Sequence, residues 1–143
     1  MTDKTLWLFH VDDEEDDRFF VARAVSTTGL PIVLSSAESG ALALSMLQAF
    51  QDWPHIVLLD IRMPSMSGFE FLEELKALAK GKLPLVIMLS SSEQDSDVER
   101  AREMGAHAYC VKPSGLEGIV AFVSRLYHSW LLSEVPCEWP SKS

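Results

Sequence analysis

The apolar residues of this chain gather into five short strand-like runs, several of which scarcely alternate with polar residues. Such continuous runs are typical of strands that are covered on both faces, as in a parallel sheet flanked by helices. The runs occupy residues 6–11, 32–35, 55–59, 85–89 and 107–111. This pattern constrains the chain to an α/β architecture.

Between the runs, apolar residues recur at the spacing of amphipathic helices. The predicted helices occupy residues 16–28, 38–50, 68–80, 95–104 and 115–132. Five strand–helix pairs in succession predict a (βα)5 unit, doubly wound with helices on both faces of a five-stranded parallel sheet. A length of 143 residues suits one domain, which we expect over residues 1–131, followed by an irregular tail over 132–143.

The charge and hydropathy of the chain exclude several classes of function. The net charge is −9, and six acidic residues follow one another over 12–17. A negative chain without a basic stripe is a poor candidate for binding nucleic acid or an anionic membrane surface. There is no visible secretory signal and no apolar run near the ~20 residues that would span a bilayer. We therefore expect a cytoplasmic protein.

The two cysteines form no metal-ligand pattern. Cys110 lies in an apolar run, so we expect a buried free thiol there. Cys137 lies in the tail and is a candidate for reactivity, although no neighbouring residue favours it.

Four of the apolar runs end in polar residues that together suit phosphoryl transfer. In a parallel α/β sheet, ligands bind outside the carboxyl ends of the strands, so these residues should gather at one edge. Carboxylates suit Mg²⁺, which prefers oxygen ligands, and an ammonium group can neutralise a phosphoryl group. The residues are Asp12 and Asp13, Asp60, Ser90, and Lys112.

Taken singly, each of these residues has a more ordinary interpretation. Asp12 and Asp13 could form a solvated acidic turn, and Asp60 could be a metal ligand, a structural cap or a nucleophile. Ser90 could belong to a turn or helix cap. The four histidines share no spacing, so we expect structural or surface positions for them.

The same residues resemble the receiver domain of two-component response regulators, of the stand-alone CheY-like type. The resemblance covers about residues 5–130 and implies a flavodoxin-like fold with strand order 2-1-3-4-5. It rests on Val11-Asp12-Asp13, on the segment from Leu58 to Pro64 with Gly68 after it, on Leu89-Ser90-Ser91, and on Tyr109 to Pro113.

The resemblance implies a role for each residue at the edge of the sheet. Asp60 would accept a phosphoryl group from a phosphohistidine, and Lys112 would pair with that group. Asp13 and Asp60 would ligate Mg²⁺ directly, Asp12 would act through water, and the backbone carbonyl of Arg62 would complete the protein ligands.

Two further residues would carry the signal outward. Ser90 would move toward the phosphoryl group, and Tyr109 would follow by changing rotamer. The surface formed by the fourth helix, fifth strand and fifth helix would change as a result.

The resemblance implies a single-domain signalling protein rather than an enzyme. Its partners would be a sensor histidine kinase or a phosphotransfer protein, and an unknown downstream protein. It could instead serve as a phosphotransfer relay or phosphate sink. A Mg²⁺-dependent phosphatase is disfavoured, because Arg62 stands where such an enzyme needs a general acid. A structural module that is never phosphorylated is disfavoured by the complete set of acid, hydroxyl and lysine.

Homodimerisation through the face formed by the fourth helix, fifth strand and fifth helix is a further expectation. The last helix carries an apolar stripe that could exceed what the sheet covers, or could simply pack on it. The stripe consists of Ile119, Phe122, Val123, Leu126 and Trp130.

Overall fold

The computed structural model describes residues 4–80, 83–91 and 94–140, in which strands and helices alternate along the chain. The strands are β1 (Leu6–Val11), β2 (Ile32–Ala37), β3 (Ile56–Asp60), β4 (Leu85–Ser90) and β5 (Ala108–Val111). The helices are α1 (Glu15–Thr28), α2 (Gly40–Ala49), α3 (Gly68–Ala79), α4 (Asp95–Glu103) and α5 (Gly115–Leu131). All the predicted elements are present, with bounds that differ from the prediction by at most two residues.

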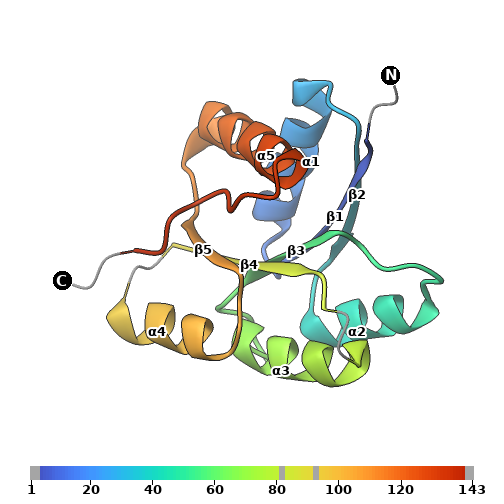
Figure 1. Ribbon diagram of the computed structural model, residues 1–143, viewed down its shortest axis with the longest axis vertical. Coiled ribbons are helices and arrows are strands. Elements are labelled where there is room, and N and C mark those ends of the chain that lie inside the picture. Colours follow the sequence, from blue (N-terminus) through green and yellow to red (C-terminus); the bar gives the residue numbers. More distant parts are fainter. Residues whose placement is uncertain (1–3, 81–82, 92–93, 141–143) are drawn as a thin grey trace.

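The five strands form one parallel sheet in the order β2-β1-β3-β4-β5. Helices α1 and α5 lie on one face, and α2, α3 and α4 lie on the other (Figure 1). This is the predicted doubly wound, flavodoxin-like α/β fold. Strands β2 and β5 form the two edges of the sheet. Because the strands are parallel, the carboxyl ends of the central strands lie at the same end of the sheet.

Side-chain alternation along the strands divides the core into two layers. Leu6 and Leu8 of β1 pack with Phe122 of α5 on one face of the sheet. Phe9 of β1 packs with Leu72 of α3 on the other face. Both faces of the inner strands are therefore buried, which explains why their sequences are apolar runs rather than alternating ones.

The turn before α3 is fixed by a reciprocal cap. The Ser67 hydroxyl accepts the Glu70 backbone N–H at 3.2 Å, and the Glu70 carboxylate accepts the Ser67 N–H at 3.0 Å. Two backbone donors that a helix start would leave unpaired are satisfied in this way. The cap holds the start of α3 directly after the loop that follows β3.

The apolar stripe of α5 packs on the sheet rather than forming a free patch. Phe122, Val123 and Leu126 are buried, while Ile119 and Trp130 are partly buried. Of the two interpretations left open by the sequence, the structure favours packing.

The prediction that Cys110 carries a free thiol is wrong. Cys110 is buried as expected, but it forms a disulfide with Cys137. The reason is tertiary: the tail after α5 turns back across the edge strand β5 (Figure 1), which brings the two Cα atoms to 5.7 Å. This separation lies within the usual range for disulfides. Over residues 132–140 the tail contains neither helix nor strand.

The described helices do not include one that is long and apolar enough to cross a bilayer.

Candidate functional site

Three carboxylates meet where β1 and β3 end. These strands are hydrogen-bonded neighbours, and Val11 of β1 lies opposite Leu59 of β3. The residues that follow this pair, Asp12 and Asp60, therefore emerge at the same level. Asp12 is fully buried, Asp60 is buried, and Asp13 is partly buried.

The geometry of these carboxylates fits a hard divalent cation. Asp12, Asp13 and Asp60 each offer an oxygen, and the three oxygens lie within 4.8 Å of one another. Asp12 Oδ2 and Asp13 Oδ1 are buried without a hydrogen-bond partner among the described residues. Buried carboxylate oxygens that lack donors are costly unless a cation satisfies them. This donor set suits Mg²⁺.

The loop after β3 approaches its neighbours too closely for a side chain at Gly68. A Cβ at this position would lie 2.4 Å from the Asp60 carbonyl oxygen. The Gly68 N–H also donates to the Ile61 carbonyl at 2.9 Å. Glycine therefore allows the start of α3 to lie against the residue that carries the central carboxylate.

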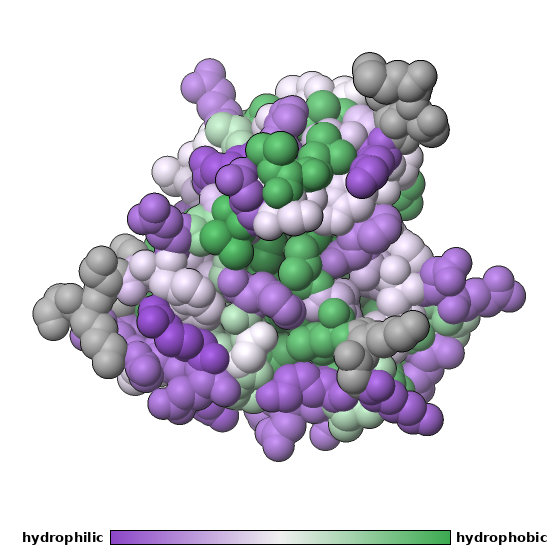
Figure 2. Space-filling model, in the orientation of Figure 1, coloured by the Kyte–Doolittle hydropathy of each residue, from purple (hydrophilic) through white to green (hydrophobic). Residues whose placement is uncertain are grey.

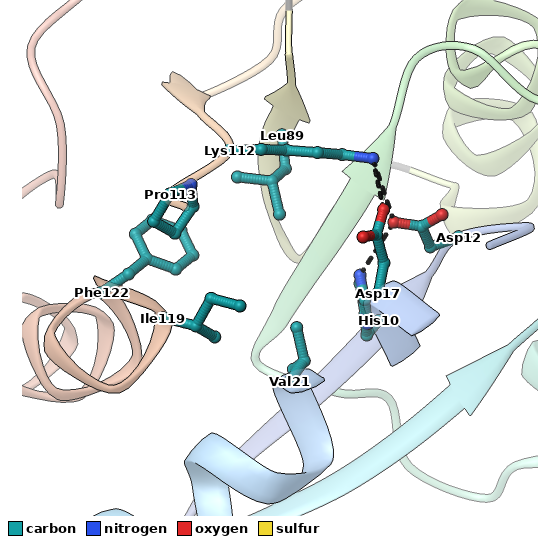
Figure 3. A pocket seen from close by; sticks show the side chains of 9 residues that line it. All are labelled: His10, Asp12, Asp17, Val21, Leu89, Lys112, Pro113, Ile119 and Phe122. Carbon is teal, nitrogen blue, oxygen red and sulfur yellow. Dashed lines mark hydrogen bonds and ion pairs between the residues drawn. The ribbon is translucent and has the colours of Figure 1, made fainter. Parts of the chain in front are cut away.

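Lys112 reaches the carboxylates from the end of β5. Its backbone N–H donates to the Ser90 carbonyl at 2.8 Å, which fixes the lysine beside the end of β4. Its Nζ lies 2.7 Å from Asp17 Oδ2, 3.3 Å from Asp60 Oδ1 and 3.4 Å from Asp12 Oδ2. Figure 3 shows the extended side chain pointing into the acidic cluster.

The carboxylates of Asp12 and Asp60 both lie near the Lys112 ammonium, but their pKa values differ strongly. Burial and the neighbouring charge of Asp12 raise the pKa of Asp60 to about 7, despite the opposing effect of Lys112. Burial also acts to raise the pKa of Asp12, but His10, the Glu14 N–H and Lys112 together lower it to about 2. At neutral pH, therefore, Asp12 is ionised while Asp60 is poised between its two forms.

The pKa of Lys112 shifts in the direction that its partners require. Burial alone would lower it, but the hydrogen bond to Asp17 and the charges of Asp12 and Asp60 raise it above its usual range. Lys112 is therefore a fixed positive charge at neutral pH.

Sequence reasoning missed Asp17, which makes the shortest contact with Lys112. Asp17 lies in the first turn of α1, within the acidic block of residues 12–17. The sequence shows the charge of this block, but it does not show which of the acidic residues faces the site. Helical phase supplies that information, because α1 begins at Glu15 and turns Asp17 toward the lysine.

His10 is a second such residue: the sequence analysis expected a structural or surface position for it and did not predict that it lies beside the site. It is 1% exposed, and its Nε2 lies 3.5 Å from Asp12 Oδ2. This distance is too long for a strong hydrogen bond. Neither ring nitrogen has a hydrogen-bond partner among the described residues. Val21, Ile119 and Phe122 line the apolar side of the same pocket (Figure 3).

The remaining predicted residues lie around this cluster. Ser90 ends β4 and is buried, and Tyr109 on β5 is buried. The Arg62 guanidinium forms an ion pair with Asp97 of α4. Two expectations stay predictions: that the backbone carbonyl of Arg62 is a metal ligand, and that Ser90 and Tyr109 move.

Comparison with known proteins agrees with this geometry. Residues 8–124 match the family described as "Response regulator receiver domain". The chain is 36% identical over 115 residues to the DNA-binding transcriptional regulator NtrC of Escherichia coli strain K12, which covers 80% of this chain and 23% of NtrC. It is 27% identical over 125 residues to the probable methanogenesis regulatory protein FilR2 of Methanothrix harundinacea, covering 85% and 81% of the two chains. The chain thus spans about a quarter of the length of NtrC.

Solved structures share the fold. The phosphorylated cyanobacterial phytochrome response regulator RcpA superposes with a TM-score of 0.80 at 24% identity, covering 96% of this chain and 100% of RcpA. CheY4 of Vibrio cholerae superposes with a TM-score of 0.72 at 24% identity, covering 86% and 99%. At this identity the likeness establishes the fold, and the sequence match establishes more: the chain belongs to the receiver domain family of two-component response regulators.

Proposed function

We propose that Asp60 accepts a phosphoryl group in a Mg²⁺-dependent reaction, and that the protein signals through the resulting change of its surface. One observation carries the proposal. Three carboxylate oxygens converge within 4.8 Å, and the Lys112 ammonium lies 3.3 Å from Asp60. No other group of the described residues combines buried carboxylates with a fixed cation in this way.

The chemistry follows from the positions of these groups. Asp12, Asp13 and Asp60 would hold Mg²⁺, which would neutralise negative charge on a bound phosphoryl group. An Asp60 carboxylate oxygen attacks phosphorus, the nitrogen–phosphorus bond of a phosphohistidine donor breaks, and the freed imidazole takes up a proton. Lys112 then pairs with a phosphoryl oxygen, and the Ser90 hydroxyl donates to another.

The partners follow from the donor chemistry. A phosphohistidine on a sensor histidine kinase or on a phosphotransfer protein suits this nucleophile, and a downstream protein would bind the altered surface. Relay or phosphate-sink behaviour uses the same site and differs only in where the phosphoryl group goes next. The acidic chain and a cytoplasmic location are consistent with either role, and neither nucleic acid nor a membrane is an expected direct partner.

The protein would act as a phosphoacceptor rather than as an enzyme with steady turnover. A phosphatase that uses an aspartyl phosphate needs a general acid two residues after the nucleophile. Arg62 stands there, is always charged, and is engaged with Asp97.

Homodimerisation through α4, β5 and α5 is a separate part of the proposal. The stripe of α5 is largely buried against the sheet, while Val111 of β5 and Leu131 of α5 stay exposed. Sedimentation at several concentrations, with and without phosphorylation, tests it.

Incubation with acetyl phosphate and Mg²⁺, followed by intact mass measurement, tests the central proposal. We expect a mass increase of one phosphoryl group, which Asp60→Asn and a metal chelator both abolish. Asp52→Asn, which changes an exposed acid outside the site, should leave the increase intact. Steady turnover of a phosphomonoester, or labelling that persists in Asp60→Asn, would overturn the assignment.

A further inference from the structure

The tail after α5 crosses the edge of the sheet at β5. Among the described residues, strand β5 pairs only with β4, so its outer side is an open edge of the sheet. In Figure 1 the tail runs from the end of α5 back across this edge. Open edge strands are usually shortened, charged or covered, because their free backbone groups pair with other chains. The tail serves as that cover.

The two ends of this crossing lie on opposite faces of the sheet. Cys110 belongs to the core layer beneath α5, and Cys137 packs against that same layer. Tyr109 belongs to the layer beneath α3 and α4, and Trp139 packs against that layer. Neighbouring strand residues point to opposite faces, so a tail that contacts both must wrap around the edge.

The far end of the tail is held by aromatic contacts. The Trp139 ring lies 6.4 Å from the Tyr109 ring, centroid to centroid. The Arg102 guanidinium of α4 lies 4.9 Å from the Trp139 ring centroid. Contacts of this kind contribute modestly when they are partly exposed. They place a tail residue against the side chain that is expected to move when Asp60 is phosphorylated.

Between α5 and Cys137 the tail is loosely attached. A hollow of about 360 Å³ lies beneath it, lined by Trp130, Glu134 and Pro136 among others. Val135 is 56% exposed. No backbone hydrogen bond joins residues 135–140 to the rest of the described chain. Figure 2 shows hydrophobic surface between the two helix layers on this side of the molecule. The disulfide is therefore the main attachment of the tail to β5.

A disulfide in this position suits exchange with thiols. Cys137 lies on the partly exposed tail, whereas Cys110 is buried. Cytosolic disulfides are generally transient and redox-sensing, because the compartment keeps thiols reduced. An attachment made by one covalent bond on a loosely held segment can be opened without unfolding the sheet.

We propose that the Cys110–Cys137 pair is a redox-reactive site for a dithiol reductant, and that its reduction releases the tail from Tyr109 and the β5 edge. A thiolate of the reductant attacks the Cys137 sulfur, the sulfur–sulfur bond breaks, and Cys110 leaves as a thiolate. The second thiol of the reductant then displaces Cys137. The protein gains two electrons and two protons, and the reductant becomes a disulfide.

The link to signalling rests on the proposed function. While the bond is closed, the Trp139 ring is held 6.4 Å from the Tyr109 ring, centroid to centroid, and we expect it to limit the rotamers open to Tyr109. Once the bond is open, Tyr109 and the neighbouring surface can respond to the phosphoryl group. The reduced protein should therefore transmit phosphorylation to this surface, and the oxidised protein should not.

Hydrogen exchange of the full-length chain, with and without dithiothreitol, tests the release of the tail. Denaturing maleimide labelling should count two thiols after treatment and none before. On reduction, exchange over 108–111 and 136–140 should quicken by at least about tenfold, while α2 stays unchanged. Cys137→Ser should show the fast exchange without reductant and should not respond to it.

Trp139→Ala separates the covalent anchor from the aromatic one. With the disulfide intact, this variant should expose Tyr109 while β5 keeps most of its protection. A change of less than about twofold over 108–111 after complete reduction would overturn the proposal. So would a pair that dithiothreitol fails to reduce in the folded protein.

A second arm adds acetyl phosphate and Mg²⁺ to both redox forms. We expect the exchange change over 109–111 on phosphorylation to be several-fold larger in the reduced form. An equal change in both forms would overturn the link to signalling. Absence of labelling in both forms would overturn the proposed function, while the exchange data without phosphate would still decide whether the tail is released.

Discussion

At the amino ends of the central strands, histidine side chains complete the backbone hydrogen bonding, whereas at the carboxyl ends buried carboxylate oxygens lack hydrogen bonds. At the amino ends, the His55 Nδ1 accepts the Trp7 N–H at 2.9 Å, and the His107 Nδ1 accepts the Val86 N–H at 2.9 Å. Both histidines also donate their own backbone N–H to the carbonyl of the same partner. At the carboxyl ends, Asp12 Oδ2 and Asp13 Oδ1 are buried without a hydrogen bond among the described residues.

This contrast indicates that the carboxyl ends of the strands, where the site lies, lower the stability of the fold in favour of function. The amino ends are closed by side chains that complete the ladder between neighbouring strands. The carboxyl ends hold like charges close together, which the protein alone does not satisfy. Functional sites often retain such destabilising arrangements, and substitutions that relieve them tend to stabilise the fold.

The largest expected effect is the stabilisation produced by Asp60→Asn in the absence of Mg²⁺. The pKa of Asp60 is raised from 3.8 to about 7, so the folded state binds its proton more tightly than the unfolded state. Stability from this group is present below pH 4 and is lost as the pH rises through about 7. At pH 8 with a chelator, Asp60→Asn should raise the free energy of unfolding by about 1–4 kcal/mol.

Urea unfolding measures this effect, with the exposed Asp52→Asn as the matched control. Mg²⁺ should stabilise the wild type more than Asp60→Asn, because binding to the folded state alone shifts the equilibrium. If Asp60→Asn were no more stable than the wild type at pH 8 without metal, the carboxylates at the carboxyl ends would not destabilise the fold. The contrast with the amino ends would then fail.

The next effect lies at the amino ends, where His107→Ala should destabilise the protein. The Val86 N–H is buried and would lose its acceptor, which costs about 1–3 kcal/mol. His55→Ala is the matched comparison, because its hydrogen bond is exposed and water can replace it. His107→Asn, whose amide oxygen can accept the same bond, should recover part of the loss. Equal costs for both alanine variants in urea unfolding would contradict this account.

The sequence predicted the elements at both ends but only part of their chemistry. Apolar runs identify strands, and the residues that end them fall at one edge, so Asp12, Asp60 and Lys112 could be found together. The histidines at the amino ends were left as structural or surface residues. Their hydrogen bonds run to strands 48 and 21 residues away, and no local pattern specifies such a pair.

Two other features were missed for related physical reasons. Which acid of the block over 12–17 faces Lys112 depends on the starting residue of α1, and a shift of one residue would turn Asp17 away. The Cys110–Cys137 disulfide joins residues 27 apart in sequence. It exists because the tail returns across β5, and an irregular segment carries no periodicity that would reveal its path.

A smaller effect is expected from Asp17→Asn, which removes the closest competitor for Lys112. The lysine would then pair more fully with Asp60, so the pKa of Asp60 should fall and its phosphorylation by acetyl phosphate at pH 6.5 should quicken. Because Asp17 is partly exposed, the gain should stay within about tenfold. Asp16→Asn is the control, since it removes an exposed charge from the same helix turn. Matching rates for the two variants would show that only overall charge matters.

The smallest effect is the pH dependence that His107 contributes. Burial lowers its pKa below 6.5, so the unfolded state binds the proton more readily, and stability falls as the pH drops through 6.5. Asp60 opposes this trend in the same range, so the measurement belongs in the Asp60→Asn background. Comparing that protein with its His107→Asn derivative, between pH 7.5 and 5, should show the steeper loss where the histidine is retained. Parallel curves of stability against pH would mean that protonation of His107 does not affect the stability of the fold, and that its hydrogen bond to Val86 contributes little.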